Sequence, residues 1–413
     1  MIQMENCFLP ANILLPSKGT DMSKWAVIAC DQYTSQPEYW HKAEDIIGTS
    51  PSALNIIYPE VYLSDGPARI ETICKTMKKY ISGGVVSQQV TNGFVLVERQ
   101  ILHGTRLGLI GAVDLEQYNF MPDAKTPIRA TEGTVLSRIP PRVKIRENAV
   151  LECPHVMLLA NDLQKELIEP VAAKKDNLRK LYDFDLMLGG GHIAAYAVED
   201  KAAKELTDKI AAMQKGSDSL FLAVGDGNHS LATAKTCWEN IKKGLSQEEI
   251  AFHPARYSLV EVINLHDDSL IFEPIHRVVF DADETDMTSS FNRYVKNLGM
   301  SLIDGADIIF EGTSKKSYSI DGIGSILPVA ILQDFLDKYL KEHRDVSVDY
   351  VHGKDNVEKL VHKKNALGIL LKTINKNALF PAIEAGGVLP RKTFSIGEAD
   401  EKRFYIECRM ITK

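Results

Sequence analysis

The segment SLFLAVGDGNHSLATAKTCWEN, residues 219–240, contains an apolar run, a polar turn and a helical pattern in succession. The run LFLAV is typical of a strand that is buried on both faces. After the turn, apolar residues recur at helical spacing at Leu231, Ala234 and Trp238, so we expect an amphipathic helix there. The sequence therefore predicts a strand-to-helix connection in which Gly-Asp-Gly-Asn-His-Ser stands at the start of the helix.

This turn has two interpretations. In the first it binds phosphate, because the first N–H groups of a helix lack intrahelical partners and carry partial positive charge. Gly225 and Gly227 would let a ligand approach the backbone, and His229 would donate to a phosphate oxygen. Asp226 would act as a general base or bind a magnesium ion that neutralises the phosphates. In the second, Asp226 or Ser230 caps the helix and His229 is structural. The spacing matches neither a Walker loop nor a dinucleotide fingerprint.

The composition limits the class of protein. A chain of 413 residues is too long for one ordinary core and predicts two domains, or three. Its residues are 45% hydrophobic and 25% charged, as in a soluble globular protein, and its net charge of -7 differs from the basic footprint of a nucleic-acid binder. Together with the phosphate-binding interpretation of the turn, this favours small-molecule substrates, and neither nucleic acid nor membrane, as partners. The oligomeric state stays open.

The cysteines and the N-terminus indicate in which cellular compartment we expect the protein. The six cysteines are widely spaced and form no Cys-x-x-Cys pair, which argues against a zinc knuckle and favours reduced thiols. The N-terminus lacks a basic segment followed by a long apolar one, so we expect no signal peptide. No apolar run reaches the roughly 18 residues of a membrane-spanning helix. We expect a cytoplasmic protein.

The patterns along the rest of the chain alternate between helix and strand. Helical patterns are clearest over 36–48, 65–84, 201–216 and 326–343, and strand patterns over 24–33, 93–115, 247–280 and 346–353, with a last strand near the C-terminus. The arginine-rich segment 129–150 contains a Pro-Pro pair that excludes one continuous helix. The sequence thus predicts a mixed α/β (α+β) protein with a domain boundary near residue 245.

Several blocks in order resemble one protein family. They are GLIGAVDLEQY, IRATEGT with SRIPPRVKIR, LAVGDGNHSLATA, FEPIHRVV and GGVLPRKTFSIG. These blocks are similar to the motifs of the "domain of unknown function 1015" family, including its His-Glu-Arg-Thr block, its Asp-Gly-His-His-Arg turn, its Pro-Thr-His-Arg block and its C-terminal Pro-Lys-Ser-Thr block. The resemblance covers the chain from about residue 30 to about residue 400.

The turn also resembles the phosphate-binding turn of the ParB/sulfiredoxin superfamily, which includes free serine kinases. Its Asp-Gly-x-His pattern aligns with Asp226, Gly227, Asn228 and His229. The resemblance implies a ParB/sulfiredoxin-like core over 1–245 and a C-terminal α+β domain over 246–413 that contributes to the site. It also implies an L-serine kinase that makes O-phosphoserine from pyrophosphate, ATP or ADP with magnesium.

Two residues of the turn depart from the family pattern. Asn228 stands where the family has histidine, and Ser230 stands where it has arginine, so one phosphate-binding cation is missing. Sulfiredoxin chemistry is disfavoured, because Asn228 occupies the place of the nucleophilic cysteine. A non-enzymatic sensor of nucleotide or phosphate is the competing hypothesis. A ParB-type nucleic-acid module is disfavoured by the acidic balance.

The family blocks supply candidates for the missing charge and for the substrate. Phosphoryl transfer depends on positioning and on neutralising the charge that develops, for which arginine is well suited. We expect Asp226, His229 and Glu132 to be catalytic. The expected phosphate ligands are Gly227, Asn228, Ser230, Arg129, Arg138, Arg142, His276, Arg277 and Lys392. Asp31 and Tyr33 would bind the amino-acid substrate, Asp31 by pairing with its ammonium group. For each of these residues, a structural role or an ordinary surface ion pair is the alternative.

Overall fold

The computed structural model describes residues 6–216, 220–363 and 366–412, and the side chains of Arg138 and Lys363 lie outside this description. The chain forms two compact units. Unit 1 comprises Met1–Ala130, Thr134–Leu270 and Glu398–Lys413, and unit 2 comprises Thr131–Gly133 and Ile271–Gly397. No helix within the described ranges has both the length and the apolar character needed to cross a bilayer.

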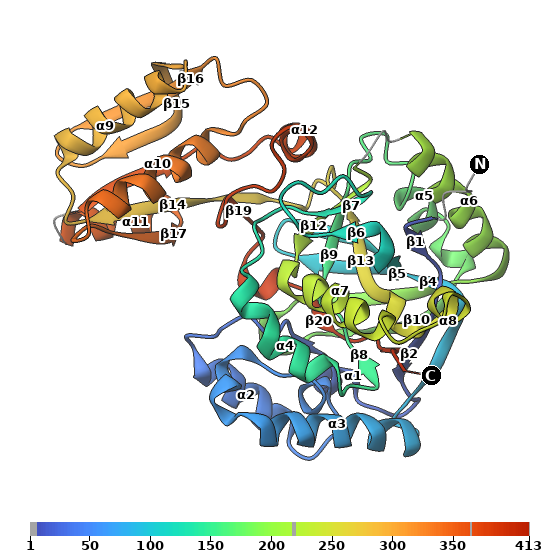
Figure 1. Ribbon diagram of the computed structural model, residues 1–413. Coiled ribbons are helices and arrows are strands. Elements are labelled where there is room, and N and C mark those ends of the chain that lie inside the picture. Colours follow the sequence, from blue (N-terminus) through green and yellow to red (C-terminus); the bar gives the residue numbers. More distant parts are fainter. Residues whose placement is uncertain (1–5, 217–219, 364–365, 413) are drawn as a thin grey trace. The chain divides into compact units, whose positions relative to one another are not determined.

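Unit 1 is built on a large mixed sheet (Figure 1). Its main path runs β10-β11-β4-β5-β13-β9-β12-β7-β6, while β1 pairs with β5 and β2 pairs with β4. Most neighbours are antiparallel, but β9–β13, β7–β12 and β6–β7 are parallel. The strands are β1 (Phe8–Leu9), β2 (Ala11–Pro16), β4 (Val86–Ile101), β5 (Gly104–Asp114), β6 (Tyr118–Asn119), β7 (Ile128–Ala130), β9 (Met157–Ala160), β10 (Arg179–Asp185), β11 (His192–Val198), β12 (Leu222–Asp226) and β13 (Tyr257–Asn264).

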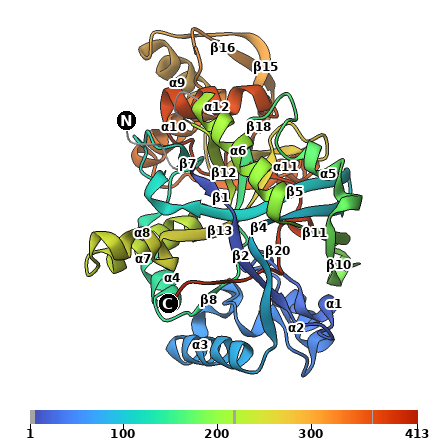
Figure 2. The ribbon, with the colours of Figure 1, turned by 90° about the vertical axis from the view of Figure 1, so that its right-hand side faces the viewer.

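Both faces of this sheet are covered. Along β4, Val95 and Val97 pack into one core and Phe94 and Leu96 into a second, as expected for a strand whose side chains alternate between two buried faces. The first core includes residues of α2 and α3, which Figure 2 shows together at one end of unit 1, and the second includes residues of α6 and α7. The helices are α1 (Met22–Trp25), α2 (Pro37–Ile47), α3 (Pro67–Ser82), α4 (Ile139–Arg146), α5 (Glu169–Ala172), α6 (Asp200–Gly216), α7 (Asn228–Lys242) and α8 (Gln247–Phe252).

The C-terminal segment, Glu398–Lys413, returns to unit 1 and forms two small sheets there. Its strand β20 (Phe404–Tyr405) pairs with β3 (Val27–Ile28), and β21 (Arg409–Met410) pairs with β8 (Leu151–Glu152). Pairing with β3 places the segment beside the chain that leads to Asp31.

Buried charges hold this segment in place. Arg403 donates to Glu261 of β13 at 2.5 Å and to Glu407 at 2.6 Å, and all three side chains are at most 3% exposed. Arg99 of β4 donates to the carbonyl oxygens of Lys402 at 2.8 Å and Asp400 at 2.6 Å. Because an unpaired buried charge is costly, these bonds strongly favour one position of the segment.

Unit 2 contains a smaller sheet of order β16-β15-β18-β14-β17, with β19 paired to β14. Phe291, Phe310 and Phe335 pack together on one face, whereas Val278 and Val357 pack on the other. The elements of unit 2 are β14 (Phe272–Phe280), α9 (Glu284–Asn297), β15 (Ser301–Glu311), β16 (Lys315–Asp321), α10 (Pro328–Glu342), β17 (Ser347–His352), α11 (Lys354–Lys363), β18 (Ala366–Leu371), α12 (Lys376–Gly386) and β19 (Phe394–Ile396).

The predicted mixed α/β class is confirmed. The boundary predicted near residue 245 falls inside unit 1, between α7 and α8. The chain stays in unit 1 past this point because β13 pairs with both β5 and β9 in the large sheet. The strand expected over 24–33 is shorter than predicted, since Met22–Trp25 is helical and only Val27–Ile28 is paired.

Candidate functional site

The strand-to-helix turn forms as the sequence predicts. Strand β12 ends at Asp226 and α7 begins at Asn228, with Gly227 between them in the left-handed conformation at φ 83°. A side chain at position 227 would be strained there, and its Cβ would lie 3.0 Å from Val156. No described side chain caps α7, and its first intrahelical bond runs from Leu231 N–H to the Gly227 oxygen. The first N–H groups of α7 therefore remain directed out of its end.

Asp226 lies beside a cation that the sequence analysis did not find. One carboxylate oxygen of Asp226 accepts from the Gly227 N–H at 2.9 Å, and the other lies 3.5 Å from Lys402 Nζ. The side chains of Asp226 and Lys402 are 19% and 10% exposed. An acid and a base are thus held together at the start of α7, with limited access of water.

Asp31 belongs to the same neighbourhood. Burial alone would raise its pKa, but the charge that His155 carries when it is protonated, a hydrogen bond from Gln32 and the charge of Lys402 hold the pKa of Asp31 below its ordinary value. Asp31 is therefore an anion that shares Lys402 with Asp226.

The imidazole of His229 makes a contact that the sequence did not indicate. Its Nε2 lies 3.2 Å from the backbone N–H of Val135 and accepts from it. A neutral imidazole that accepts at Nε2 carries its proton on Nδ1. The predicted donation from His229 to a phosphate would therefore come from Nδ1.

His155, Tyr405 and Ser230 form a chain of hydrogen bonds next to this turn. Tyr405 Oη lies 2.6 Å from His155 Nδ1, and His155 Nε2 lies 3.2 Å from Ser230 Oγ. The backbone N–H of Cys30 donates to Tyr405 Oη at 3.3 Å. Both His155 and Tyr405 are buried. Their hydrogen bonds connect Ser230 of α7 to the segment that carries Asp31.

A cavity of about 440 Å³ adjoins this chain of hydrogen bonds. Its polar lining includes Ser230, His155, Tyr405 and Arg142. The apolar part of the lining comes from Ile56, Ile57, Tyr58, Leu63, Met77, Ile145, Ala149, Leu151 and Val156. A mostly apolar cavity with a few convergent polar groups is typical of a small-molecule site.

The other predicted residues of unit 1 have contacts of their own. Arg129 is buried in β7, and its Nε donates to the Thr126 oxygen at 2.9 Å. Arg142 forms an ion pair with Glu60 at the cavity wall. Arg138 ends a short 3-10 helix, Leu136–Arg138, and its side chain is outside the described part of the structure.

Tyr33 stacks on Tyr39 of α2, with ring centroids 3.9 Å apart. This contact occupies one face of the Tyr33 ring. Burial and the charges of Asp400 and Glu398 raise the pKa of its hydroxyl.

The remaining predicted residues, Glu132, His276, Arg277 and Lys392, belong to unit 2. Arg277 is fully buried, and its guanidinium donates to Gln333 and to the Ile275 oxygen. His276 accepts from the Leu371 N–H at 3.1 Å, and burial and the charge of Arg277 lower its pKa to about 4.

The backbone of Glu132 forms an isolated parallel β-bridge with that of Leu389. Burial lowers the pKa of Arg277, and the charge of Glu132 opposes this shift. Lys392 is exposed in a turn at φ 60° before β19. Of the predicted residues, the structure therefore brings together Asp226, Asp31 and Ser230 through Lys402 and His155, and assigns Glu132, His276, Arg277 and Lys392 to the other unit.

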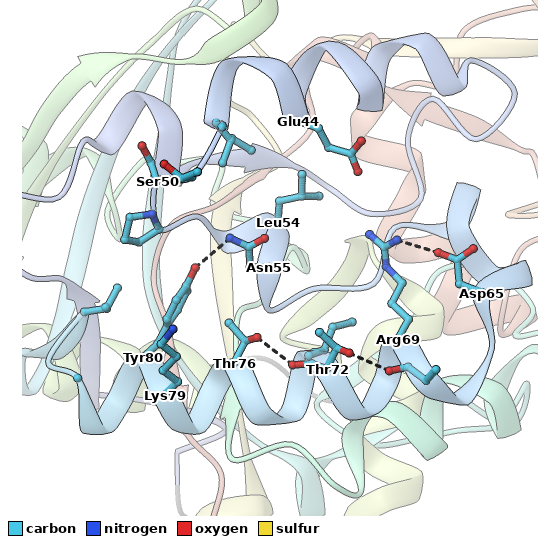
Figure 3. Close-up of a pocket in the computed structure, with 18 residues that line it drawn as sticks. Glu44, Ser50, Leu54, Asn55, Asp65, Arg69, Thr72, Thr76, Lys79 and Tyr80 are labelled. Atoms are coloured by element: carbon cyan, nitrogen blue, oxygen red, sulfur yellow. Dashed lines mark hydrogen bonds and ion pairs between the residues drawn. The ribbon is translucent and has the colours of Figure 1, made fainter.

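A larger cavity of about 850 Å³ lies between α2 and α3 (Figure 3). Arg69 pairs with Asp65 there at 2.8 Å, and Asn55 donates to Tyr80 at 3.0 Å. None of the residues of the α7 turn lines it. We therefore place the candidate site at the α7 turn and the smaller cavity.

The expected magnesium ion would need side chains that can be its ligands. Within the described ranges, no three side chains of His, Cys, Asp or Glu group together to hold a metal ion. Magnesium in phosphoryl-transfer sites is commonly held by one or two carboxylates together with substrate phosphates and water. Asp226 and Asp31 are of the type that such a site uses.

Lys402, His155 and Tyr405 were missed by the sequence analysis. Lys402 precedes β20 and Tyr405 ends it, in EKRFYIE, and His155 precedes β9, in CPHVMLL. A charged or titratable residue at the end of an apolar run is a weak signal, because many such residues lie at the surface. Tyr405 hydrogen-bonds to His155, and the pairing of β20 with β3, which no local pattern reports, brings Lys402 and Tyr405 beside the segment that carries Asp31.

The fold and the site define a mixed α/β protein with a strand-to-helix turn at the start of α7, an Asp226–Lys402 ion pair and a mostly apolar cavity lined by Ser230. The chain belongs to the family described as protein of unknown function (DUF1015), whose model matches residues 14–374. A comparison with curated proteins finds no match.

Solved structures that resemble the chain include free serine kinases. A variant in complex with ADP has 9% identity and a TM-score of 0.39, covering 73% of this chain and 91% of that chain. A variant in complex with AMP has 10% identity and a TM-score of 0.40, covering 73% and 90%. A conserved hypothetical protein from Pyrococcus furiosus has 9% identity and a TM-score of 0.36, covering 73% and 94%.

Proposed function

We propose that the protein is a small-molecule phosphotransferase that phosphorylates the hydroxyl of free L-serine, with pyrophosphate, ATP or ADP as donor. The observation that carries the proposal is the Asp226–Lys402 pair at the first turn of α7. The resemblance of the turn to that of free serine kinases supports serine as the acceptor.

In the proposed reaction, the first turn of α7, Lys402 and Asp226 each have a separate role. The N–H groups of Asn228, His229 and Ser230 hold the transferred phosphate, since they lie in the first turn of α7. Lys402 neutralises charge that develops on the phosphoryl oxygens. Asp226 accepts the proton of the serine hydroxyl, and positioning by the site supplies much of the rate.

Asp31 fits the amino-acid part of the substrate. Its lowered pKa keeps it ionised at neutral pH, so it can pair with the substrate ammonium group. Magnesium, held by phosphate oxygens of the donor, would supply further neutralisation.

The test incubates the purified full chain with L-serine, magnesium and, separately, pyrophosphate, ATP or ADP, and measures O-phosphoserine by mass spectrometry. Asp226→Asn is assayed in parallel, with Asp45→Asn, an exposed aspartate of α2, as the matched control. We expect phosphoserine from one donor, lost in Asp226→Asn and retained in Asp45→Asn.

The second candidate function is a non-enzymatic sensor of nucleotide or phosphate. A neutral serine at position 230, in place of the arginine of the family pattern, favours it. It predicts binding of pyrophosphate or nucleotide without any phosphoserine, and binding that tolerates Asp226→Asn. That combination would overturn the serine-kinase proposal.

A further inference from the structure

We infer that the hydroxyl of Ser230 donates a hydrogen bond to a phosphate oxygen of the bound substrate, and that Tyr405 and His155 are positioning residues that fix the direction of this donation. The inference deepens the proposed phosphotransferase function and rests on it. It also gives a role to the residue that replaces the arginine of the family pattern.

The direction of the chain is set at Tyr405. Its oxygen accepts from the Cys30 N–H, so its own proton has two neighbouring acceptors, His155 Nδ1 at 2.6 Å and the Cys30 sulfur. Burial raises the pKa of the Cys30 thiol to about 12, and a protonated thiol is a weak acceptor. Burial also raises the pKa of Tyr405 well above its ordinary value, so the phenol keeps its proton. Tyr405 therefore donates to His155.

The next step follows from the two nitrogens of the ring. A neutral imidazole that accepts at Nδ1 carries its hydrogen on Nε2. Nε2 lies 3.2 Å from Ser230 Oγ, so His155 donates to the serine oxygen. This leaves the single hydrogen of the Ser230 hydroxyl to be donated elsewhere.

The helix does not take up that hydrogen. Thr233 and Thr236 of α7 donate to the carbonyl oxygens four residues earlier, at 2.7 and 2.8 Å. Ser230 has no such bond among the described contacts, and its hydroxyl contacts His155 instead. Since Ser230 lines the cavity of about 440 Å³, the hydrogen is available to a group bound there.

The position of Ser230 selects an anionic oxygen as the acceptor. Its backbone N–H belongs to the first turn of α7, so hydroxyl and N–H can reach one phosphate together. A hydroxyl that accepts from an imidazole is polarised toward donation, and a bond to a charged oxygen is stronger than one to a neutral oxygen.

The experiment measures pyrophosphate and ADP binding by titration calorimetry, with magnesium present. We expect Ser230→Ala to weaken binding of the donor by about tenfold, as for loss of one hydrogen bond to a charged group. Ser230→Thr should restore most of the affinity. Thr236→Val, which removes a hydroxyl of the same helix that does not line the cavity, should leave it unchanged.

A second readout is independent of any substrate. In protein labelled with ¹⁵N-histidine, the His155 signal, assigned by its loss in His155→Gln, should show the hydrogen on Nε2. Tyr405→Phe should shift this signal toward the other tautomer and weaken donor binding, because the serine hydroxyl loses its fixed direction.

The outcomes separate the two proposals. Wild-type affinity in Ser230→Ala, a hydrogen on His155 Nδ1 in the native protein, or no binding of either donor would overturn the inference. Donor binding that depends on Ser230, together with no phosphoserine, would overturn serine phosphorylation and leave the role of Ser230 standing.

Discussion

Lys402 Nζ lies 3.5 Å from the carboxylate of Asp226, although the two residues are far apart in the sequence. Asp226 ends β12, whereas Lys402 lies on the C-terminal segment that returns to unit 1. A positive charge is therefore placed beside the turn by a residue from the other end of the chain. The proposed phosphotransferase activity would therefore depend on how the C-terminal segment is held.

Lys402→Met should lower the rate of phosphoserine formation by about 100-fold or more, since a preorganised group that neutralises developing charge contributes on this scale. Lys402→Arg should retain more activity, because it keeps the charge. Turnover would be measured with saturating serine and donor, and folding by circular dichroism. A folded Lys402→Met variant with wild-type turnover would contradict this role; Lys204→Met, on the exposed side of α6, is the control.

Glu261→Gln should destabilise the protein by about 3–5 kcal/mol, because it leaves the buried charge of Arg403 with one carboxylate fewer. Urea unfolding monitored by fluorescence gives the free energy. Glu205→Gln, which removes an exposed pair with Lys201, should cause no measurable change. If both variants unfold at the same urea concentration, Arg403 does not anchor the C-terminal segment as argued.

Gly227→Ala should cost about 1–2 kcal/mol of stability, because alanine is strained at φ 83°. The added Cβ would also lie 3.0 Å from Val156, so the start of α7 must shift and donor binding should weaken. Gly386→Ala, whose Cβ would have no atom within 4 Å, is the control. Thermal unfolding and calorimetry measure the two effects, and equal behaviour of the variants would refute the strain at position 227.

His276 should make unit 2 less stable in weak acid. Burial and the charge of Arg277 lower its folded-state pKa to about 4, below the ordinary value of 6.5. As the pH falls from 6.5 to 4, the unfolded chain takes up a proton that the folded chain does not, so stability falls over this window. Urea titrations at pH 7 and pH 4.5 would measure the loss, which should be smaller in His276→Gln. An equal loss in both proteins would contradict this origin.

Only those parts of the candidate site that lie within one short segment of the chain could be predicted from the sequence. The turn at Gly227 and the helix after it follow from an apolar run, two glycines and helical spacing, all within one segment. Asp31 was identified at a strand end for the same reason. The expected arginines were not the cations found beside Asp226: Arg129 is buried with a backbone partner, Arg142 pairs with Glu60, and Arg277 belongs to unit 2.

The sequence by itself determined the mixed α/β class and the β12–α7 turn, because hydrophobic period and glycine conformation act over a few residues. Only the tertiary structure decided that Lys402, His155 and Tyr405 complete the site. The positions of Lys402 and Tyr405 depend on the pairing of β20 with β3 and on the buried bonds of Arg99 and Arg403, whereas His155 is held next to β9 of the large sheet. Long-range pairing leaves no periodic signal in the residues that it joins.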